Sequence, residues 1–188
     1  MNKILFCSKL KANPTIKEDI DTVFVTIDDV KILIRISWQN GYVVYLDLTE
    51  VNSVEKKLAY ANKITLNALT KFLYRQTPTL LLPFSIYTTK FMKRVYQQTL
   101  NIPFGFTTSY KELSERLSTS PRAIGMAMKK NPIPLIIPCH RVIGKKGQLT
   151  GFSSGLKIKE KLLKLEQTKK VDLTIYTNIK YVNGGKSV

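Results

Sequence analysis

The single histidine of this 188-residue chain lies directly beside one of its two cysteines, in residues 136–143 (IIPCHRVI). A thiol is a strong nucleophile only as its thiolate, and imidazole is the side chain best suited to take the thiol proton near neutral pH. Apolar residues flank the pair, and Gly144 ends the segment. The pattern predicts a short buried strand that delivers Cys139 and His140 as a reactive pair, with Arg141 in a basic cleft.

Direct adjacency constrains how the two side chains can cooperate. Successive side chains on a strand point to opposite faces, so Cys139 and His140 cannot simply face each other. Either the chain turns sharply after Pro138, or a water molecule carries the proton between sulfur and imidazole. The alternative without chemistry is a buried, inert Cys139 beside a His140 that bonds to the backbone.

The formal net charge of +17 is concentrated in the second half of the chain. Residues 1–83 contain 11 Lys and Arg against 8 Asp and Glu (+3), whereas residues 84–188 contain 19 against 5 (+14). Such a basic half points to a polyanionic partner, most commonly nucleic acid. The alternative, a general enrichment of surface lysine, is usually matched by glutamate, and here it is not.

The two cysteines, Cys7 and Cys139, make no disulfide framework, and with one histidine they are too few for a closed zinc site. We therefore predict neither a metal nor another cofactor. The N-terminal apolar run is too short for a signal peptide, and no apolar stretch approaches the length of a membrane span. We expect a reduced intracellular compartment, the cytoplasm, and no membrane partner.

The first half of the chain predicts a β-rich α/β scaffold without evident chemistry. Runs of β-branched and aromatic residues at 23–27, 32–36 and 42–46 predict strands, and Asn40-Gly41 between the last two predicts a hairpin turn. Residues 58–73 have the apolar spacing of a helix. A proline-bounded linker at 78–83 then predicts a scaffold domain at 1–83, a catalytic DNA-binding domain at 84–168 and an extension of unassigned role at 169–188.

The second domain is predicted to be mainly helical. One helix continues to Pro103, and a capping box of Ser109 and Glu112 opens a short helix. Ser120-Pro121 opens the next helix, which runs to about residue 130. Two short helices joined by a polar turn are typical of helix-turn-helix DNA-binding domains, and Arg122 lies where such domains contact the duplex.

The second of these helices carries small residues where base-reading side chains would be expected. Ala123 and Ala127 share a face with Lys130, and Gly125 lies in mid-helix, where it costs about 1 kcal/mol relative to alanine. Such a face favours close, sequence-independent binding in which phosphate contacts supply the affinity. Tight helix–helix packing is the alternative explanation.

A glutamate near the end of the last predicted helix, residues 156–166, lies on an unexpected face. Glu166 shares the apolar side with Leu162 and Leu163, near a helix C-terminus where a carboxylate is disfavoured. Its natural partner is His140, because a carboxylate holds imidazole in one tautomer and makes it more basic. A surface glutamate among lysines is the alternative.

Residues 138–143 (PCHRVI), preceded by 131–134 (NPIP) and 120–125 (SPRAIG), strongly resemble the O6-alkylguanine-DNA alkyltransferases. The resemblance spans about residues 86–166. It implies a ribonuclease-H-like first domain and a winged-helix-like helix-turn-helix domain. It also implies direct-reversal DNA repair, in which the alkyl group of O6-alkylguanine, and of O4-alkylthymine, passes once to Cys139. The protein would bind the minor groove of double-stranded DNA as a monomer, without sequence preference.

The resemblance implies roles for individual residues. Cys139 accepts the alkyl group, while His140, oriented by Glu166, takes the thiol proton through a water. Asn131 bonds backbone near the active-site segment, Arg122 fills the gap left by a flipped guanine, and Tyr110 crowds the 3′ phosphate and helps to protonate the leaving base. Further predicted contacts are to DNA from Ala123, Ala127, Lys130 and Arg141, and to the base from Met128, Val142, Phe152 and Ser153.

Several positions differ from the family pattern. Phe152 stands where many relatives have tyrosine, so any hydroxyl function there is lost, and residues 153–155 (SSG) depart from the usual glycine pair. The zinc site of some relatives' first domain is missing, and the tail with strand-like residues 173–176 extends beyond the usual family end. Relatives that bind without repair lack the cysteine, so Cys139 argues for a catalytic member.

The chemistry of the residues agrees with this resemblance. A base inside a duplex must be extruded before its alkyl carbon can be reached. Sulfur then displaces the guanine oxygen, and the thioether product consumes Cys139. Two alternatives stay open: a helix-turn-helix regulator with a structural cysteine, which needs base-reading side chains, and a Cys–His hydrolase, which leaves the basic helical half unexplained.

Overall fold

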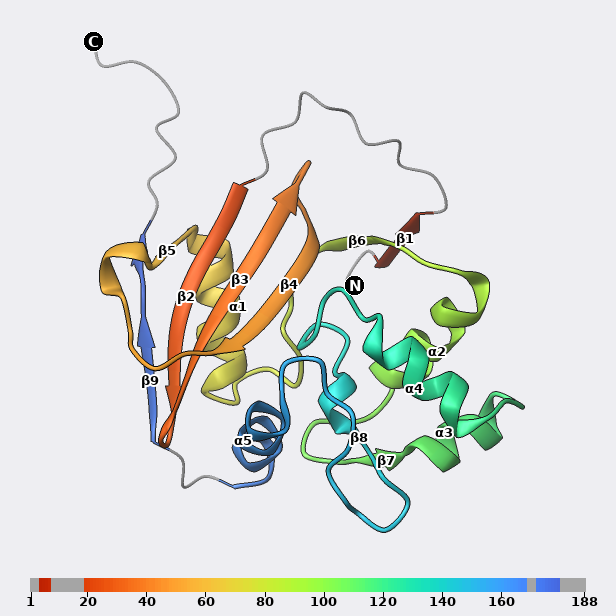
Figure 1. Cartoon of the computed structure of the whole chain (residues 1–188). Coiled ribbons are helices and arrows are strands. Elements are labelled where there is room, and N and C mark those ends of the chain that lie inside the picture. The colour runs from red at the N-terminus through yellow and green to blue at the C-terminus, as the bar shows by residue number, and fades with distance from the viewer. Residues whose placement is uncertain (1–3, 8–18, 169–171, 180–188) are drawn as a thin grey trace.

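The computed structural model describes residues 4–7, 19–168 and 172–179 (Figure 1). Its main sheet runs in the order β1-β6-β4-β3-β2-β5-β10, with β9 also paired to β2. The strands are β1 (Ile4–Cys7), β2 (Asp19–Ile27), β3 (Val30–Gln39), β4 (Tyr42–Glu50), β5 (Tyr60–Ala61), β6 (Phe84–Tyr87), β9 (Leu173–Tyr176) and β10 (Asn178–Ile179). Strands β2, β3 and β4 pair antiparallel, whereas β6 pairs parallel with β1 and β4, so the sheet is mixed.

Strands β2, β3 and β4 form the centre of the sheet, and one face of this centre is buried. In β3 buried and partly exposed residues alternate along nearly the whole strand, which is the period-2 pattern of a half-buried strand. The predicted turn at Asn40-Gly41 joins β3 to β4, and both residues have positive φ (52° and 78°). That geometry is typical of two-residue hairpins, which favour asparagine followed by glycine.

The first helix begins later than its apolar spacing predicts. Residues 56–58 form a short 3₁₀ turn, Tyr60–Ala61 is β5, and helix α1 spans Lys63–Leu73. Asn62 caps α1 by accepting a hydrogen bond from the Thr65 amide (2.8 Å). The buried Asp21 carboxylate on β2 accepts bonds from the Asn62 backbone and side chain (2.9 and 2.7 Å), so a tertiary contact determines where α1 starts.

The sheet continues beyond the predicted linker. Residues 84–87 form β6 inside the sheet, so strands of the N-terminal architecture lie on both sides of residue 83. The strand-like segment of the tail is indeed a strand: β9 pairs antiparallel with β2, from Ile27 opposite Leu173 to Phe24 opposite Tyr176. The extension therefore returns to the first domain.

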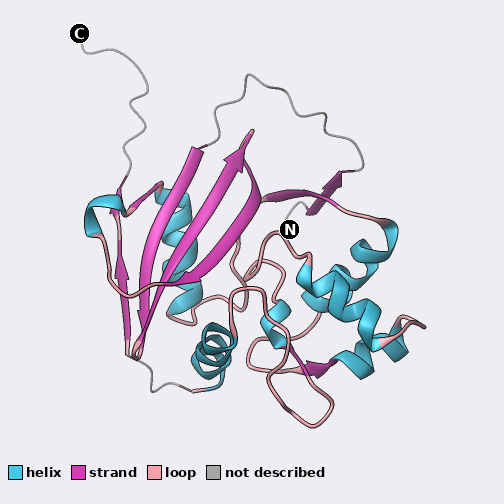
Figure 2. Ribbon diagram, viewed as in Figure 1, coloured by secondary structure: helices cyan, strands magenta, loops and turns pink. Residues whose placement is uncertain are grey.

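Helices dominate the remaining part of the chain (Figure 2). They are α2 (Lys90–Leu100), α3 (Tyr110–Arg116), α4 (Pro121–Lys129) and α5 (Leu156–Gln167). In Figure 1, α2, α3 and α4 gather on the side away from β9, and α5 lies between them and the lower ends of β2 and β3. Two short strands, β7 (Thr108–Ser109) and β8 (Val142–Ile143), pair parallel and connect the start of α3 to the Cys139 segment. Helix α5 thus stands at the junction of the sheet and the helical group.

Helix α5 is fastened to the β2–β3 turn by Asp28. The Asp28 carboxylate lies 2.6 Å from Lys164 Nζ and 3.2 Å from Lys161 Nζ, and it accepts a bond from the Asp172 amide (3.2 Å). These contacts, led by the hydrogen bond from Lys164, lower the pKa of Asp28 from 3.8 to about 2. One side chain therefore joins the sheet, α5 and the segment that leads into β9.

Replacing Asp28 with asparagine is expected to lower the melting temperature at pH 7 slightly, because the ion pairs with Lys161 and Lys164 are lost. The folded-state pKa is depressed, so this stabilisation is present above pH 3.8 and is lost as the pH falls toward about 2. Melting curves of wild type and Asp28→Asn should converge over that interval. Asp19→Asn, at an exposed position on β2, is the control; a difference that persists unchanged to pH 2 would contradict the assignment.

Candidate active site

The two helices that precede the site are positioned by their caps. Ser109 and Glu112 form the predicted capping box of α3, and Ser120 caps α4 with Pro121 in its first turn. Leu113 and Ile124 are fully buried where α3 and α4 pack together. The Tyr96 hydroxyl on α2 donates a hydrogen bond to the Ala127 carbonyl (3.1 Å), which ties α4 to the helix behind it. With its other side packed against α2 and α3, α4 presents Arg122, Met126 and Lys130 to solvent.

The reactive segment is a tight turn and not the predicted continuous strand. Residues 139–141 form a 3₁₀ turn directly after Pro138, and only Val142–Ile143 continue as β8. A 3₁₀ turn has three residues per turn, so neighbouring side chains do not point to opposite faces as they would on a strand. The sequence left open whether the chain turns sharply after Pro138 or a water links Cys139 to His140. The backbone does turn sharply after Pro138.

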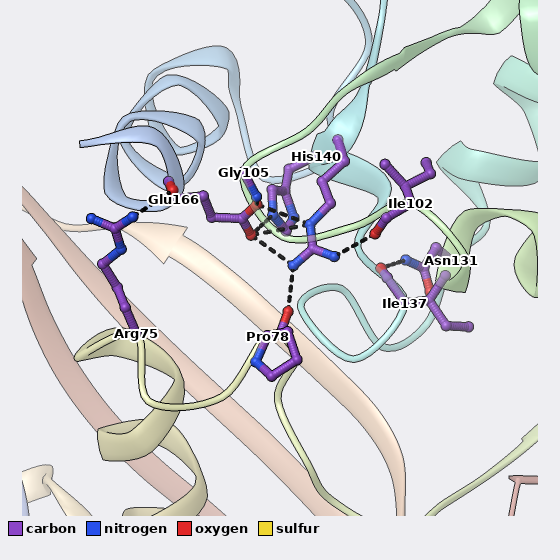
Figure 3. Close-up of polar contacts among 9 residues, drawn as sticks. Arg75, Pro78, Ile102, Gly105, Asn131, Ile137, His140 and Glu166 are labelled. Atoms are coloured by element: carbon purple, nitrogen blue, oxygen red, sulfur yellow. Dashed lines mark hydrogen bonds and ion pairs between the residues drawn. The ribbon is translucent and has the colours of Figure 1, made fainter. Parts of the chain in front are cut away.

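A buried carboxylate organises this turn (Figure 3). Glu166 on α5 is 2% exposed, and its Oε1 lies 2.8 Å from His140 Nε2. Arg141 donates to both carboxylate oxygens from Nε and Nη2, at 2.9 to 3.2 Å, and the Gly105 amide donates to Oε2 (3.1 Å). Burial raises the pKa of Glu166, but hydrogen bonds from His140 and Arg141 outweigh it and leave the pKa below its usual value. The carboxylate is therefore ionised and accepts a hydrogen bond from the His140 Nε2–H group.

The same contacts leave one nitrogen of His140 available. With Nε2 donating to Glu166, Nδ1 is the acceptor nitrogen of the neutral ring. His140 is 0% exposed, and Nδ1 has no hydrogen-bond partner among the described residues. Burial lowers the pKa of His140, while the Glu166 carboxylate opposes that shift. The ring is neutral near physiological pH and can take a proton at Nδ1.

The prediction that Arg141 contacts DNA is wrong. Its side chain is 0% exposed, and besides Glu166 it donates to the carbonyls of Ile102 and Pro78 (both 2.8 Å). A basic residue next to the Cys139-His140 pair suggested a cleft, but the Arg141 guanidinium is buried against the Glu166 carboxylate. Removing one member of such a buried pair costs about 3–5 kcal/mol. Arg141 stabilises the turn from within.

Cys139 is buried and has a polar neighbour. The thiol is 3% exposed, and Asn131 Nδ2 donates to its sulfur (3.1 Å) and to the Ile137 carbonyl (2.9 Å). The Asn131 side-chain oxygen accepts from the Ile133 amide (3.1 Å), so Asn131 links both ends of the loop before Cys139. Burial raises the pKa of the Cys139 thiol to about 11, which the Asn131 bond only partly opposes. The cysteine is a thiol at neutral pH and needs a base to react.

A cavity of about 570 Å³ opens beside α4. It is lined by Tyr110, Pro121, Gly125, Lys129, Thr150, Gly151, Phe152 and Ser153. Its volume is within the usual range of small-molecule sites. Phe152 and Ser153, predicted to contact the base, are among its walls, whereas Met128 and Val142 are buried in the core (4% and 0% exposed) and are not. The cavity therefore has one aromatic wall from the loop before α5 and one from Tyr110.

The outer face of α4 differs from the prediction at one residue. Arg122 and Lys130 are exposed and Ala123 is partly exposed, but Ala127 is 2% exposed and packs inward, so the prediction that Ala127 contacts DNA is wrong. The face also presents Met126 (58% exposed). Small residues at i and i+4 share a side of a helix, but neighbouring α2 occupies the side that carries Ala127.

One residue of the site was missed by sequence reasoning. Lys159 on α5 is fully buried, and its Nζ donates to the carbonyls of Val142 (2.6 Å) and Thr150 (2.7 Å). Burial lowers its pKa to about 8. The Tyr110 hydroxyl donates to the Gly151 carbonyl (3.0 Å), so both side chains hold the loop that forms the cavity wall. Lys159 lies seven residues before Glu166 on the same helix face, and the argument that singled out Glu166 applies to it equally.

The described parts of the chain contain neither a metal site nor a membrane-spanning helix. Among those residues, no group of three or more His, Cys, Asp and Glu side chains is placed to hold a metal ion. No helix in the same ranges combines the length and apolar character that a bilayer crossing requires.

Comparison with known proteins places this geometry in a family. Residues 90–168 match the family described as "6-O-methylguanine DNA methyltransferase, DNA binding domain". The chain is 51% identical over 81 residues to a methylated-DNA–protein-cysteine methyltransferase of Sulfolobus acidocaldarius, which is 43% of this chain and 52% of the relative. A relative of the same name from Methanocaldococcus vulcanius is 46% identical over 90 residues, 48% of this chain and 55% of the relative. Residues 90–168 of the chain belong to the methylated-DNA–protein-cysteine methyltransferase family.

Solved structures extend the likeness to the first domain of the methyltransferase family. Mycobacterium tuberculosis OGT in complex with DNA has a TM-score of 0.61 and 28% identity, covering 72% of this chain and 86% of that chain. The O6-methylguanine-DNA methyltransferase of Pyrococcus kodakaraensis shares the fold, with a TM-score of 0.62 at 23% identity over 80% of this chain and 100% of that chain. The family predicted from residues 120–143 is confirmed, with an N-terminal mixed sheet domain and a helical C-terminal DNA-binding domain. The aligned sequence spans about half the length of these curated relatives.

The raised thiol pKa of this methyltransferase-family site is testable without any substrate. In Cys7→Ser protein, thiolate absorbance should appear with a midpoint near pH 11, because buried Cys139 is deprotonated only when the cost of a buried charge is overcome. Asn131→Ala removes a bond that lowers this pKa, so its midpoint should be higher still. A midpoint below 9 in the parent protein would mean that the thiolate already exists at rest.

Proposed function

We propose that this protein repairs O6-alkylguanine in double-stranded DNA by moving the alkyl group onto Cys139. The observation that carries the proposal is the buried His140–Glu166 pair next to a cysteine whose thiol pKa is raised. A base is needed at such a thiol, and Nδ1 of His140 is the free acceptor. Sequence identity with curated methyltransferases over the same segment supports the assignment.

The reaction needs one proton acceptor and one proton donor. The Cys139 proton passes to His140 Nδ1, by way of a water, as sulfur forms a bond to the alkyl carbon and the bond from that carbon to O6 breaks. The electron pair goes to the guanine, which leaves more easily if a donor protonates it. Tyr110 lines the cavity, and burial raises its pKa to about 12, so it keeps its hydroxyl proton near neutral pH. The thioether is stable to water, so each molecule acts once.

DNA binding is proposed to come from the exposed face of α4. Arg122 lies in the first turn of α4, with Lys129 and Lys130 exposed at the other end, and partly exposed Ala123 and Gly125 permit close approach. This face offers charge for phosphates and few base-reading groups, which favours binding to the minor groove without sequence preference. The solved complex of the Mycobacterium tuberculosis relative with DNA supports a DNA partner.

Several finer assignments belong to the same proposal. The first domain is ribonuclease-H-like, and α3 and α4 form a winged-helix-like helix-turn-helix. The scaffold domain at 1–83 has its sheet completed by β6, from the start of the catalytic domain at 84–168, and by β9, from the extension at 169–188. The protein acts as a monomer in the cytoplasm, where a reduced thiol persists, uses no cofactor, and also accepts O4-alkylthymine.

The acceptor is tested by intact mass. Incubation with duplex DNA containing O6-methylguanine should add the mass of one methyl group per protein, located on Cys139 by peptide mapping, with Cys7 unmodified. Cys7→Ser should behave as wild type, and Cys139→Ala should gain nothing. Transfer beyond one equivalent, or methylation of Cys139→Ala, would sink the proposal.

Replacing Arg122 with alanine separates base flipping from chemistry. If Arg122 holds the extruded state, the single-turnover rate on duplex should fall by about tenfold or more, since extrusion costs a few kcal/mol. The rate with free O6-benzylguanine, which needs no flipping, should stay within about twofold of wild type on the same argument. Arg116→Ala, an exposed arginine at the end of α3, is the charge-matched control. Equal losses on both substrates would show that Arg122 supports the pocket itself.

A further inference from the structure

Arg75 is an arginine of the first domain with an unusual backbone. It follows α1 directly after the C-cap residue Tyr74, and its φ is +61°, in the left-handed region that favours glycine. Its amide donates to the Phe72 carbonyl (2.9 Å), which closes the end of the helix. A bulky residue stays in the left-handed region only when surrounding contacts hold it there. The contacts of the Arg75 side chain are therefore of interest.

The Arg75 side chain reaches across to α5 and ends at Glu166 (Figure 3). Arg75 Nη2 donates to the Glu166 main-chain carbonyl at 3.1 Å, from 91 residues away in sequence. Glu166 lies in the last turn of α5, where carbonyls lack partners within the helix and cations interact favourably with the helix dipole. Arg75 therefore caps α5 at the residue whose carboxylate binds His140.

Gly105 packs against the same carbonyl, and the Phe104 ring packs against the guanidinium of Arg75. A Cβ placed on Gly105, whose φ is +79°, would come within 3.2 Å of the Glu166 carbonyl oxygen, so glycine permits this close approach. The guanidinium carbons of Arg75 and Arg141 lie 5.8 and 5.5 Å from the centroid of the Phe104 ring. Arg75 Nη1 is buried and has no hydrogen-bond partner among the described residues. Leaving Nη1 buried without a partner costs free energy, and a single hydrogen bond to the end of α5 offsets little of that cost. Stability alone therefore does not explain why the guanidinium lies here.

We propose that Arg75 is a positioning residue for alkyl transfer, acting through Glu166 on His140. This inference rests on the function proposed above and extends it to the first domain. By holding the Glu166 carbonyl, Arg75 fixes how far α5 advances toward the Cys139 turn. That position sets the 2.8 Å contact between the carboxylate and His140 Nε2, and with it the basicity of Nδ1.

The test compares Arg75→Ala and Arg75→Lys with wild type, with Arg35→Ala as the matched control. Arg35 belongs to the same domain but forms an exposed ion pair with Asp47 on the sheet, so its removal makes the same charge change away from Glu166. Two quantities are measured: the single-turnover rate at saturating methylated duplex, with DNA affinity determined separately, and the pKa of His140 by NMR. His140 is the only histidine in the chain, so tag-free protein gives one imidazole titration.

In Arg75→Ala the rate at saturating DNA should fall by about tenfold, with affinity for DNA unchanged within about twofold, because the loss arises after binding. The pKa of His140 should fall, because a displaced Glu166 supports the imidazolium less. Simple loss of a nearby cation would shift that pKa in the opposite direction, so the sign identifies the cause. Arg75→Lys keeps a donor for the carbonyl and should recover most of the rate, and Arg35→Ala should match wild type.

Two results would overturn the inference. One is an unchanged rate and an unchanged His140 pKa in Arg75→Ala. The other is a slower rate with a lower melting temperature but no fall in the His140 pKa and no recovery in Arg75→Lys, which would make Arg75 structural only. If wild type itself gains no methyl group, the proposed function fails, and the His140 titration still decides whether Arg75 positions the pair.

Discussion

The buried carboxylate of Glu166 is the interaction on which this structure depends. A single ionised group accepts bonds from His140, Arg141 and the Gly105 amide, and nearly all its surface is removed from water. A charge in such a place is tolerated only when its partners are complete. Because those partners come from separate loops, satisfying one carboxylate places the Cys139 turn, the loop after α2 and the end of α5 together.

The same group explains why the two halves of the chain form one site. Arg141, bound to Glu166, also donates to the Pro78 carbonyl in the segment that joins α1 to β6. Arg75 contacts the Glu166 main chain, and Asp28 on the β2–β3 turn holds two lysines of α5. The first domain is therefore connected to the Cys139 turn through α5.

A structural feature could be predicted from the sequence when the interactions that determine it lie between residues close together in the chain. The capping box of Ser109 and Glu112, the N-cap at Ser120 and the Asn40-Gly41 hairpin were predicted correctly because their hydrogen bonds and dihedral angles involve near neighbours. The pairing of Glu166 with His140 was inferred from a carboxylate on the wrong helix face. Arg141 and Ala127 were assigned to DNA because charge and size were considered without knowledge of what packs beside them. The left-handed Arg75 and the start of α1 directly after its N-cap Asn62 depend on tertiary contacts that no local pattern encodes.

The pairing of β9 with β2 determines the order in which the molecule can be assembled. Strand β2 is synthesised among the first elements, but one of its neighbours in the sheet is not made until α5 has been translated, and Lys164 lies 136 residues after its partner Asp28. Contacts so distant in sequence form slowly, because a long loop must close first. During translation one edge of β2 therefore lacks the β9 partner while the helices fold, and an unpaired edge promotes association between chains. Strand β9 covers that edge only after α5 has been made.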